Sequence, residues 1–432
     1  MEQNPEQNKS FADTLSEEER RRSRIYATVS AIFGCISEQV IDSNTIIILY
    51  LMMLGGSASF SLFSSSISAF AHAFTSIPFA YIIARTGLRK CYTFAVFLGI
   101  ASFLVMVFAP YAGGAAKYIV VFSCLAYSCS RPLYSATWYP LLNNFLRPHD
   151  RVPFFGTMRV LYMLFNTCLL FLLGKLMGAK PPIWLMQVAI AFAGITLFGR
   201  KVCMDKLPMD PTAKREDVHF PESILAIRKS PRLIGFACLM FYLDLFVLAA
   251  IPLATIYMKT VLQLPASTIM YATSTNLVGV IFGNFVMKFI VRKFGLFWFQ
   301  LRTHLIFLFV IGFLIFVHEG NSWNLPLLFA SFFLNGMGYA SLLCLGSTRQ
   351  LSLGQPDNRV ISMAFVTSMQ NLGTFLGRIG VTVALSSGAL ATSWEFKGLS
   401  FTHFHTLFIL CFAMTFIGLI FQMLATTNAD EA

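Results

Sequence analysis

Twelve apolar stretches, each long enough to cross a lipid bilayer, follow one another along this chain of 432 residues. They comprise residues 25–54, 59–84, 91–110, 117–146, 153–178, 182–199, 233–260, 267–291, 297–317, 324–347, 360–390 and 401–426. A helix that crosses the hydrocarbon core needs about 20 predominantly apolar residues. Only 12% of the residues are charged, about half the share of a typical soluble domain. The pattern excludes a soluble globular protein and predicts an all-α membrane protein with twelve transmembrane helices.

Short sequence matches recur along the chain at a constant separation of 208 residues. Pro148, Arg151 and Val152 recur as Pro356, Arg359 and Val360, and Gly87-Leu88 recurs as Gly295-Leu296. Each copy lies in a short basic connection between apolar stretches. A duplication in the same orientation predicts two six-helix bundles. The expected parts are an N-terminal tail (1–24), a first bundle (25–199), a central loop (200–232), a second bundle (233–426) and a C-terminal tail (427–432).

Basic residues are distributed unevenly between the two sets of connections. If the N-terminus lies inside, 23 of the 32 Lys and Arg residues fall on the inner side and 5 on the outer side. Because positive charge marks cytoplasmic connections, we expect a multi-pass protein of the plasma (inner) membrane with both termini in the cytoplasm. The net charge of +12 therefore reflects topology and an attraction to anionic lipid, and it does not indicate nucleic-acid binding.

Three acidic residues, Glu38, Asp42 and Asp244, lie inside apolar stretches. A charge at bilayer depth costs at least about 2.5 kcal/mol, so such groups usually face a cavity and pair with one another. Glu38 and Asp42 share one helix face, and Arg131 lies at a similar depth by the helical rise per residue. We predict that Asp42, Glu38 and Arg131 meet near mid-membrane. The carboxylates of Asp42, Glu38 and Asp244 are the candidates for binding and releasing a coupling proton. The alternative is that these charges form static ion pairs between helices.

Other polar and aromatic side chains are candidates for substrate contact. Tyr127, Arg131, Tyr134 and Trp138 recur at helical spacing on one face. An arginine between aromatic rings suits a sugar ring or an organic anion, although an aromatic packing seam gives the same pattern. Tyr339 follows Arg131 by the repeat distance of 208 residues. The remaining candidates, which could equally join helices to one another, are Tyr162, Asn166, Asn335, Gln370, Asn371 and Arg378. Arg378 could face the cavity or snorkel outward.

The loop between the second and third apolar stretches resembles a motif of the major facilitator superfamily. That family reads Gly-x-x-x-Asp-Arg-x-Gly-Arg-Arg in this loop, and this chain has Arg85, Gly87 and Arg89 in place, with Lys90 next to them. Ala84 stands where the family has its Asp, and Arg292 stands there in the second copy. With twelve helices and a six-plus-six repeat, the resemblance covers nearly the whole chain.

The resemblance implies a fold of two six-helix bundles, a central cavity between them and a gate at the cytoplasmic side. The residues implied for the gate and loop motif are Arg85, Gly87, Arg89, Lys90, Arg151, Gly295 and Arg359, together with Arg292. The proton-coupled drug exporters of the family carry a Gly-Pro-rich motif in the fifth helix. Here no proline lies between Phe154 and Lys180, which argues against that class.

The function that these features favour is secondary active transport of a small polar organic solute, such as a sugar, an amino acid or an organic acid. We expect alternating access with proton-coupled symport. The alternatives are a proton-coupled exporter of drug-like compounds and an uncoupled facilitator. The seven histidines form no catalytic cluster and the nine cysteines no metal-ligand spacing. We therefore expect no enzyme, no metal and no cofactor. The expected partners of this monomer are the bilayer, a small-molecule substrate and protons.

Overall fold

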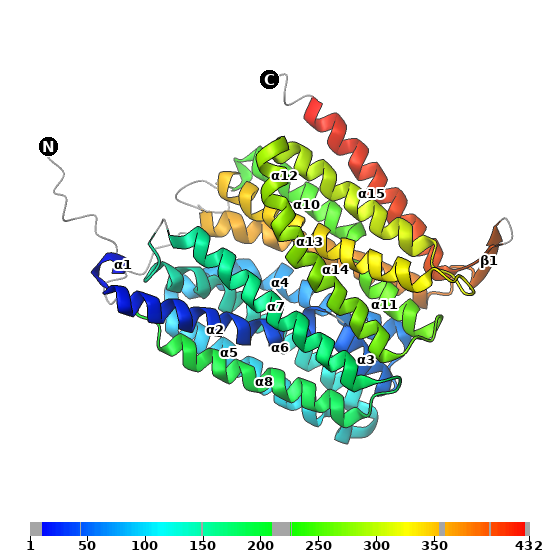
Figure 1. Cartoon of the computed structure of the whole chain (residues 1–432), viewed down its shortest axis with the longest axis horizontal. Coiled ribbons are helices and arrows are strands. Elements are labelled where there is room, and N and C mark those ends of the chain that lie inside the picture. Colours follow the sequence, from blue (N-terminus) through cyan, green and yellow to red (C-terminus); the bar gives the residue numbers. More distant parts are fainter. Residues whose placement is uncertain are drawn as a thin grey trace.

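The structure, a computed structural model, is an assembly of long helices that run side by side (Figure 1). It describes residues 11–43, 45–147, 150–209, 225, 227–353, 359–396 and 399–427. The start of α2 lies at one end of the molecule, called the terminal end, and the β1–β2 hairpin lies at the opposite end, called the hairpin end (Figure 1).

The helices of the first half are α1 (Phe11–Thr14), α2 (Glu17–Asp42), α3 (Thr45–Met53), α4 (Ala58–Thr86), α5 (Leu88–Phe108), η2 (Ala109–Ala115), α6 (Ala116–Asn143), α7 (Arg151–Met177) and α8 (Ile183–Asp205). The second half contains α10 (Pro231–Val247), α11 (Ala250–Thr260), α12 (Ala266–Ile315), α13 (Asn324–Leu353), α14 (Arg359–Ser386), β1 (Ser393–Phe396), β2 (Leu399–Thr402) and α15 (His403–Thr427). The strands β1 and β2 pair antiparallel, with Ser393 opposite Thr402.

The described helices account for the twelve predicted spans. Helices α2 and α3 form the first span, bent by 52° at the break between them. Helices α10 and α11 together form the seventh span. The 50 residues of α12 would extend about 75 Å as one straight helix, more than twice the bilayer core. Instead, Asn276 and Phe307 both lie against α13, next to Gly336 and Gly338. Helix α12 therefore folds back on itself and contains the eighth and ninth spans. The predicted all-α fold with twelve membrane helices is confirmed.

The internal repeat is visible in where the helices begin. The starts of α4 and α12, of α6 and α13, and of α7 and α14 are each separated by 208 residues. The first spans of both halves are also broken, between α2 and α3 and between α10 and α11. One pair differs. Gly87 ends α4 with a φ of 95°, whereas Gly295 lies inside the continuous α12. The duplication thus extends from loop residues to helix boundaries.

Each half packs mainly within itself. In the first half α2 contacts α7 and α8, α4 contacts α6, and α5 contacts α6 and α8. In the second half α12 contacts α13 and α15, and α10 contacts α14. The largest contacts between the halves join α4 to α14 and α7 to α12. The molecule therefore consists of two six-helix bundles, which contact each other mainly along the α4–α14 and α7–α12 helix pairs.

The two bundles share a hydrophobic core toward the hairpin end. One cluster combines buried residues of α3, such as Tyr50, with buried residues of α11, such as Tyr257. The hydroxyls of Thr45 and Thr273 lie 2.8 Å apart across the same interface. Among the described residues, the large clusters nearer the terminal end each belong to one bundle only. The bundles are therefore held together most extensively at the hairpin end.

Candidate functional site

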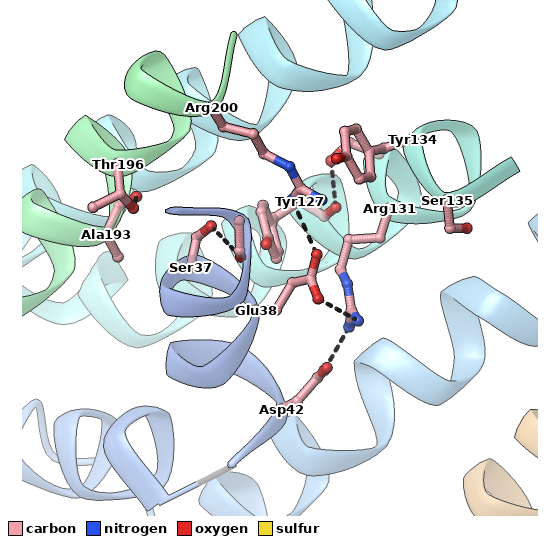
Figure 2. A network of polar contacts seen from close by, with 12 residues as sticks. Ser37, Glu38, Asp42, Tyr127, Arg131, Tyr134, Ser135, Ala193, Thr196 and Arg200 are labelled. Atoms are coloured by element: carbon pink, nitrogen blue, oxygen red, sulfur yellow. Dashed lines mark hydrogen bonds and ion pairs between the residues drawn. The ribbon is translucent and has the colours of Figure 1, made fainter. Parts of the chain in front are cut away.

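Four helices of the first bundle bring a group of charged side chains together (Figure 2). Arg131 of α6 donates from Nη1 to Asp42 Oδ1 of α2 at 2.6 Å, and its Nη2 lies 3.7 Å from Glu38 Oε2. Ser68 of α4 donates to Asp42 Oδ1 at 3.0 Å. The three residues predicted from the sequence to meet at one depth are thus neighbours in space.

Asp42 occupies an unusual position, since it is the last residue of α2. The C-terminal end of a helix carries partial negative charge, which disfavours a carboxylate there. The guanidinium of Arg131 and the hydroxyl of Ser68 supply compensating donors. The break between α2 and α3 therefore places a carboxylate at a helix end inside the bundle, where a cation holds it. Its side chain keeps 35% exposure, so the carboxylate is only partly buried.

Arg200 of α8 is a member of this group that the sequence alone does not reveal. The sequence assigns Arg200 to the central loop, but α8 continues to Asp205. Arg200 Nη1 lies 3.0 Å from Glu38 Oε1, and its guanidinium carbon lies 3.3 Å from the ring centre of Tyr134. Glu38 therefore bridges Arg200 and Arg131 (Figure 2). The sequence does contain one signal for this position of Arg200. Arg200 follows Ala193 and Thr196 at helical spacing, and all three are buried on one face of α8.

The aromatic candidates of α6 serve partly as packing residues. Tyr127 is buried and contacts the ring of Phe103 edge-on, with ring centres 4.9 Å apart. Tyr134 stacks on Trp138 with ring centres 5.9 Å apart. Tyr134 also carries the guanidinium of Arg200 on its face, a cation–π contact that stabilises a desolvated arginine. The aromatic side chains of α6 thus contact the charged group directly, through Tyr134 and Arg200.

The second bundle supplies Arg378 and Asp244. Arg378 of α14 donates from Nε to the carbonyl of Leu248 at 3.3 Å and from Nη1 to the carbonyl of Ser65 on α4 of the first bundle. Asp244 of α10 is 4% exposed, and its Oδ1 has no hydrogen-bond partner. Tyr339 of α13 lies within electrostatic range of Asp42, Arg131, Asp244 and Arg378. The charged residues of both bundles therefore border one region.

The amide candidates bond mainly within the helices. Asn166 Nδ2 donates to the carbonyl of Tyr162, and Asn371 Nδ2 donates to the carbonyl of Thr367. Tyr162 lies beside the apolar cluster of Phe145 and Phe154. Asn335 is different, because it donates from Nδ2 to Asn276 Oδ1 across helices at 3.0 Å. The carbonyl of Gln370 accepts from Thr374.

The predicted cytoplasmic gate is described only in part. Arg85, Arg89 and Lys90 are exposed, and Arg85 lies over the ring of Tyr81 at 4.4 Å. Arg151 is the first residue of α7. The side chains of Arg292 and Arg359 and the surroundings of Gly295 lie outside the described residues, as do Pro148 and Pro356. The clustering of these residues into a gate stays a prediction.

The connection between α6 and α7 contacts the N-terminal segment. Arg147 Nε lies 2.9 Å from Asp13 Oδ1, and Arg24 Nη2 lies 3.5 Å from Asp150 Oδ2. Among the described residues, no group of three His, Cys, Asp or Glu side chains is arranged to hold a metal ion.

No protein-family model matches the sequence, and no curated protein matches it either. The fold is similar to those of several solved transporters. A mutant form of the nucleoside transporter NupG matches with a TM-score of 0.72 and 12% identity, over 93% of this chain and 99% of that one. The xylose transporter XylE from E. coli matches with a TM-score of 0.66 and 12% identity, over 94% and 98%.

A bacterial homologue of the iron transporter ferroportin in the inward-facing state matches with a TM-score of 0.65 and 12% identity, over 95% of this chain and 99% of that one. At such identities the likeness is one of fold, and it extends over nearly the full length of each chain. This chain is therefore a multi-pass membrane protein with the twelve-helix, two-bundle fold of the major facilitator superfamily.

Proposed function

We propose that this protein is a secondary active transporter that moves a small polar organic solute by alternating access, coupled to protons. The observation that carries the proposal is the group formed by Glu38, Asp42, Arg131 and Arg200. Charged side chains at this depth are costly to keep in a membrane and are usually functional. The neighbours NupG and XylE, whose structures are described as those of nucleoside and xylose transporters, support the transport class.

The arrangement supports coupling because one cation holds two carboxylates at unequal distances. Arg131 is 2.6 Å from Asp42 and 3.7 Å from Glu38, and Glu38 has a second cation in Arg200. Protonation of Asp42 would remove its attraction for Arg131, which could then turn to Glu38 or to solute. A proton could thus change which groups face the cavity.

The uneven packing of the bundles supports alternating access. The bundles share a core at the hairpin end, whereas the large clusters near the terminal end belong to single bundles. Rocking that opens one end while closing the other is typical of two-bundle transporters. We propose that the terminal end faces the cytoplasm, because exposed basic residues such as Arg85 and Arg89 lie there. We also propose a monomer in the plasma (inner) membrane, with the two bundles joined by the segment between Asp205 and Pro231.

The test compares Asp42→Asn with the unchanged protein in proteoliposomes. A solute is first identified by thermal shift, since a ligand stabilises the form that binds it. Asp42→Asn is expected to abolish solute accumulation driven by a pH gradient. Exchange of labelled for unlabelled solute is expected to persist, because exchange needs no net proton movement.

Glu38→Gln is measured beside it, with Glu395→Gln as a matched control, since Glu395 lies exposed on β1. Full gradient-driven uptake by both Asp42→Asn and Glu38→Gln would overturn proton coupling at this site and favour an uncoupled facilitator. If both variants lose thermal stability and exchange together, the group is a structural ion pair.

A further inference from the structure

Arg378 differs from the other two arginines that border the central region. Arg131 and Arg200 each contact a carboxylate. Among the described residues, no carboxylate lies within ion-pair distance of Arg378, whose hydrogen-bond partners are the backbone carbonyls of Ser65 and Leu248. Carbonyl oxygens carry only partial charge, so they compensate a guanidinium less well than a carboxylate does. The positive charge of Arg378 is therefore left without an anionic contact.

The close crossing of α14 and α10 places Arg378 beside Asp244. A Cβ added at Gly377 would overlap the carbonyl of Leu245, so the two helix backbones touch there. Arg378 bonds the carbonyl of Leu248, and the backbone N–H of Leu248 in turn donates to the carbonyl of Asp244 at 3.4 Å. Arg378 thus contacts the residue one helical turn after Asp244, and the two charges lie within electrostatic range of each other.

The Asp244 carboxyl has few polar neighbours. It is 4% exposed and its Oδ1 accepts no hydrogen bond. The titratable or charged groups near Asp244 or its neighbours are Arg378 on α14, Tyr339 on α13, His304 on α12 and Tyr242 on α10 itself. Tyr242 donates to the carbonyl of Met414, and His304 Nδ1 contacts the carbonyl of Gln300. A buried carboxylate without hydrogen bonds is costly, so a proton or a closer cation would stabilise this group.

We propose that Arg378 binds the carboxylate of a small organic anion, and that Asp244 takes up a proton when the anion binds, separate from the proton exchanged at Asp42. The inference rests on the proposed transport function and narrows its substrate to organic acids. With Asp244 protonated, Arg378 is free to pair with the anion. With Asp244 ionised and the anion absent, Arg378 turns to Asp244. No covalent bond changes, and the proton comes from the aqueous phase.

The same event links solute binding to the contact between the bundles. Arg378 reaches across to Ser65 of α4, and Ser65 is one turn from Ser68, which bonds Asp42. An anion that takes the place of the Ser65 carbonyl would release this cross-bundle hydrogen bond. Binding at Arg378 would then loosen the α4–α14 seam at the moment when the solute is held.

The experiment uses the purified full-length protein in lipid nanodiscs. Lactate, benzoate, succinate and citrate are the anionic probes, and xylose and uridine are the neutral ones. Binding is followed by thermal shift and by calorimetry, and proton uptake is followed in weakly buffered solution. At least one anion is expected to bind with uptake of one proton, more tightly at low pH than at high pH. Failure of all four anions to bind, or binding without proton uptake, overturns the proposal.

Three variants separate this inference from the coupling site at Asp42. Arg378→Lys keeps the positive charge but loses the planar guanidinium, which can donate two parallel hydrogen bonds to a carboxylate. Affinity for the anion should therefore fall roughly tenfold to hundredfold. Asp244→Asn should bind the anion with no pH dependence and no proton uptake. Asp42→Asn should still take up the proton on binding while failing to accumulate solute.

Arg159→Gln, an exposed residue of α7, is the control and should bind as the unchanged protein does. Unchanged anion affinity in Arg378→Lys, or proton uptake that persists in Asp244→Asn, contradicts the assignment of these residues even if transport itself is confirmed. Proton uptake on anion binding is also measured on the unchanged protein. The proposal can therefore be contradicted even if a variant fails to fold.

Discussion

At the scale of single residues, Gly34 leaves the space that Arg200 occupies in the charged group. The guanidinium of Arg200 crosses α2 directly over Gly34, so that a Cβ there would overlap it. Only glycine leaves this space, and the arginine needs it to reach both Glu38 and the ring of Tyr134. Arg200 is 7% exposed, so water cannot replace these partners. A residue with no charge of its own therefore fixes the position of a buried cation.

We predict that Gly34→Ala displaces Arg200 and separates it from Glu38. Arg200 would then stay buried without its carboxylate partner, so the midpoint of thermal unfolding should fall. Gly156→Ala is the matched control. It adds the same methyl group in a helix with nothing nearby, and it should be neutral or stabilising by up to about 1 kcal/mol. Equal midpoints for the two variants would contradict the role assigned to Gly34.

At the scale of elements, close helix crossings hold the second bundle together. Added Cβ atoms at Gly279 and Gly336 would overlap the carbonyls of Phe333 and Asn276, respectively. The backbones of α12 and α13 thus touch where Asn276 and Asn335 share a hydrogen bond. In lipid, the hydrophobic effect does not drive helices together. Small residues let membrane helices approach closely, and van der Waals packing between them then stabilises the pair. The bundle is therefore sensitive to residue size at this crossing.

We predict that Gly336→Ala forces α12 and α13 apart and destabilises the protein by about 1–3 kcal/mol, the usual effect of overpacking. The readout is the fraction of protein that remains monodisperse after heating in detergent. Gly380→Ala, on α14 with open space around it, should leave that fraction unchanged. If Gly336→Ala is as heat-stable as Gly380→Ala, the helices are not in backbone contact.

At the scale of the whole molecule, the two bundles share one core at the hairpin end. Thr45 of α3 and Thr273 of α12 face each other there, with hydroxyl oxygens 2.8 Å apart. The carbonyl of Gly178 accepts from the N–H of Ser267 across the same interface at 3.0 Å. If the bundles rock as rigid bodies, these contacts must separate when the hairpin end opens. Transport then requires that they are not permanent.

We predict that a disulfide between Thr45→Cys and Thr273→Cys stops transport and that a reducing agent restores it. The cross-link would hold the bundles in the state closed at the hairpin end, while solute binding from the terminal end persists. The background should carry Ser in place of the exposed Cys168 and Cys238, and each single cysteine variant is the control. Full transport by the oxidised double variant would rule out opening at this interface.

The sequence by itself determined the membrane fold, because apolar stretches of bilayer length and a repeat of 208 residues depend only on local composition and register. The depth of Asp42, Glu38 and Arg131 also follows from the helical rise, so their approach was predictable. The starts of α7 and α14 at Arg151 and Arg359 extend that repeat into the structure.

The tertiary structure alone decided which partners these charges have. Arg200 joins the group only because α8 continues past the apolar stretch and lies against α2 over Gly34. Arg378 reaches Ser65 only because α14 and α4 pack across the bundles. Residues from different helices meet according to crossing angle and rotation about each helix axis. The crossing angle and the rotation of each helix are set by packing between helices. The sequence pattern of a single helix does not reveal either of them.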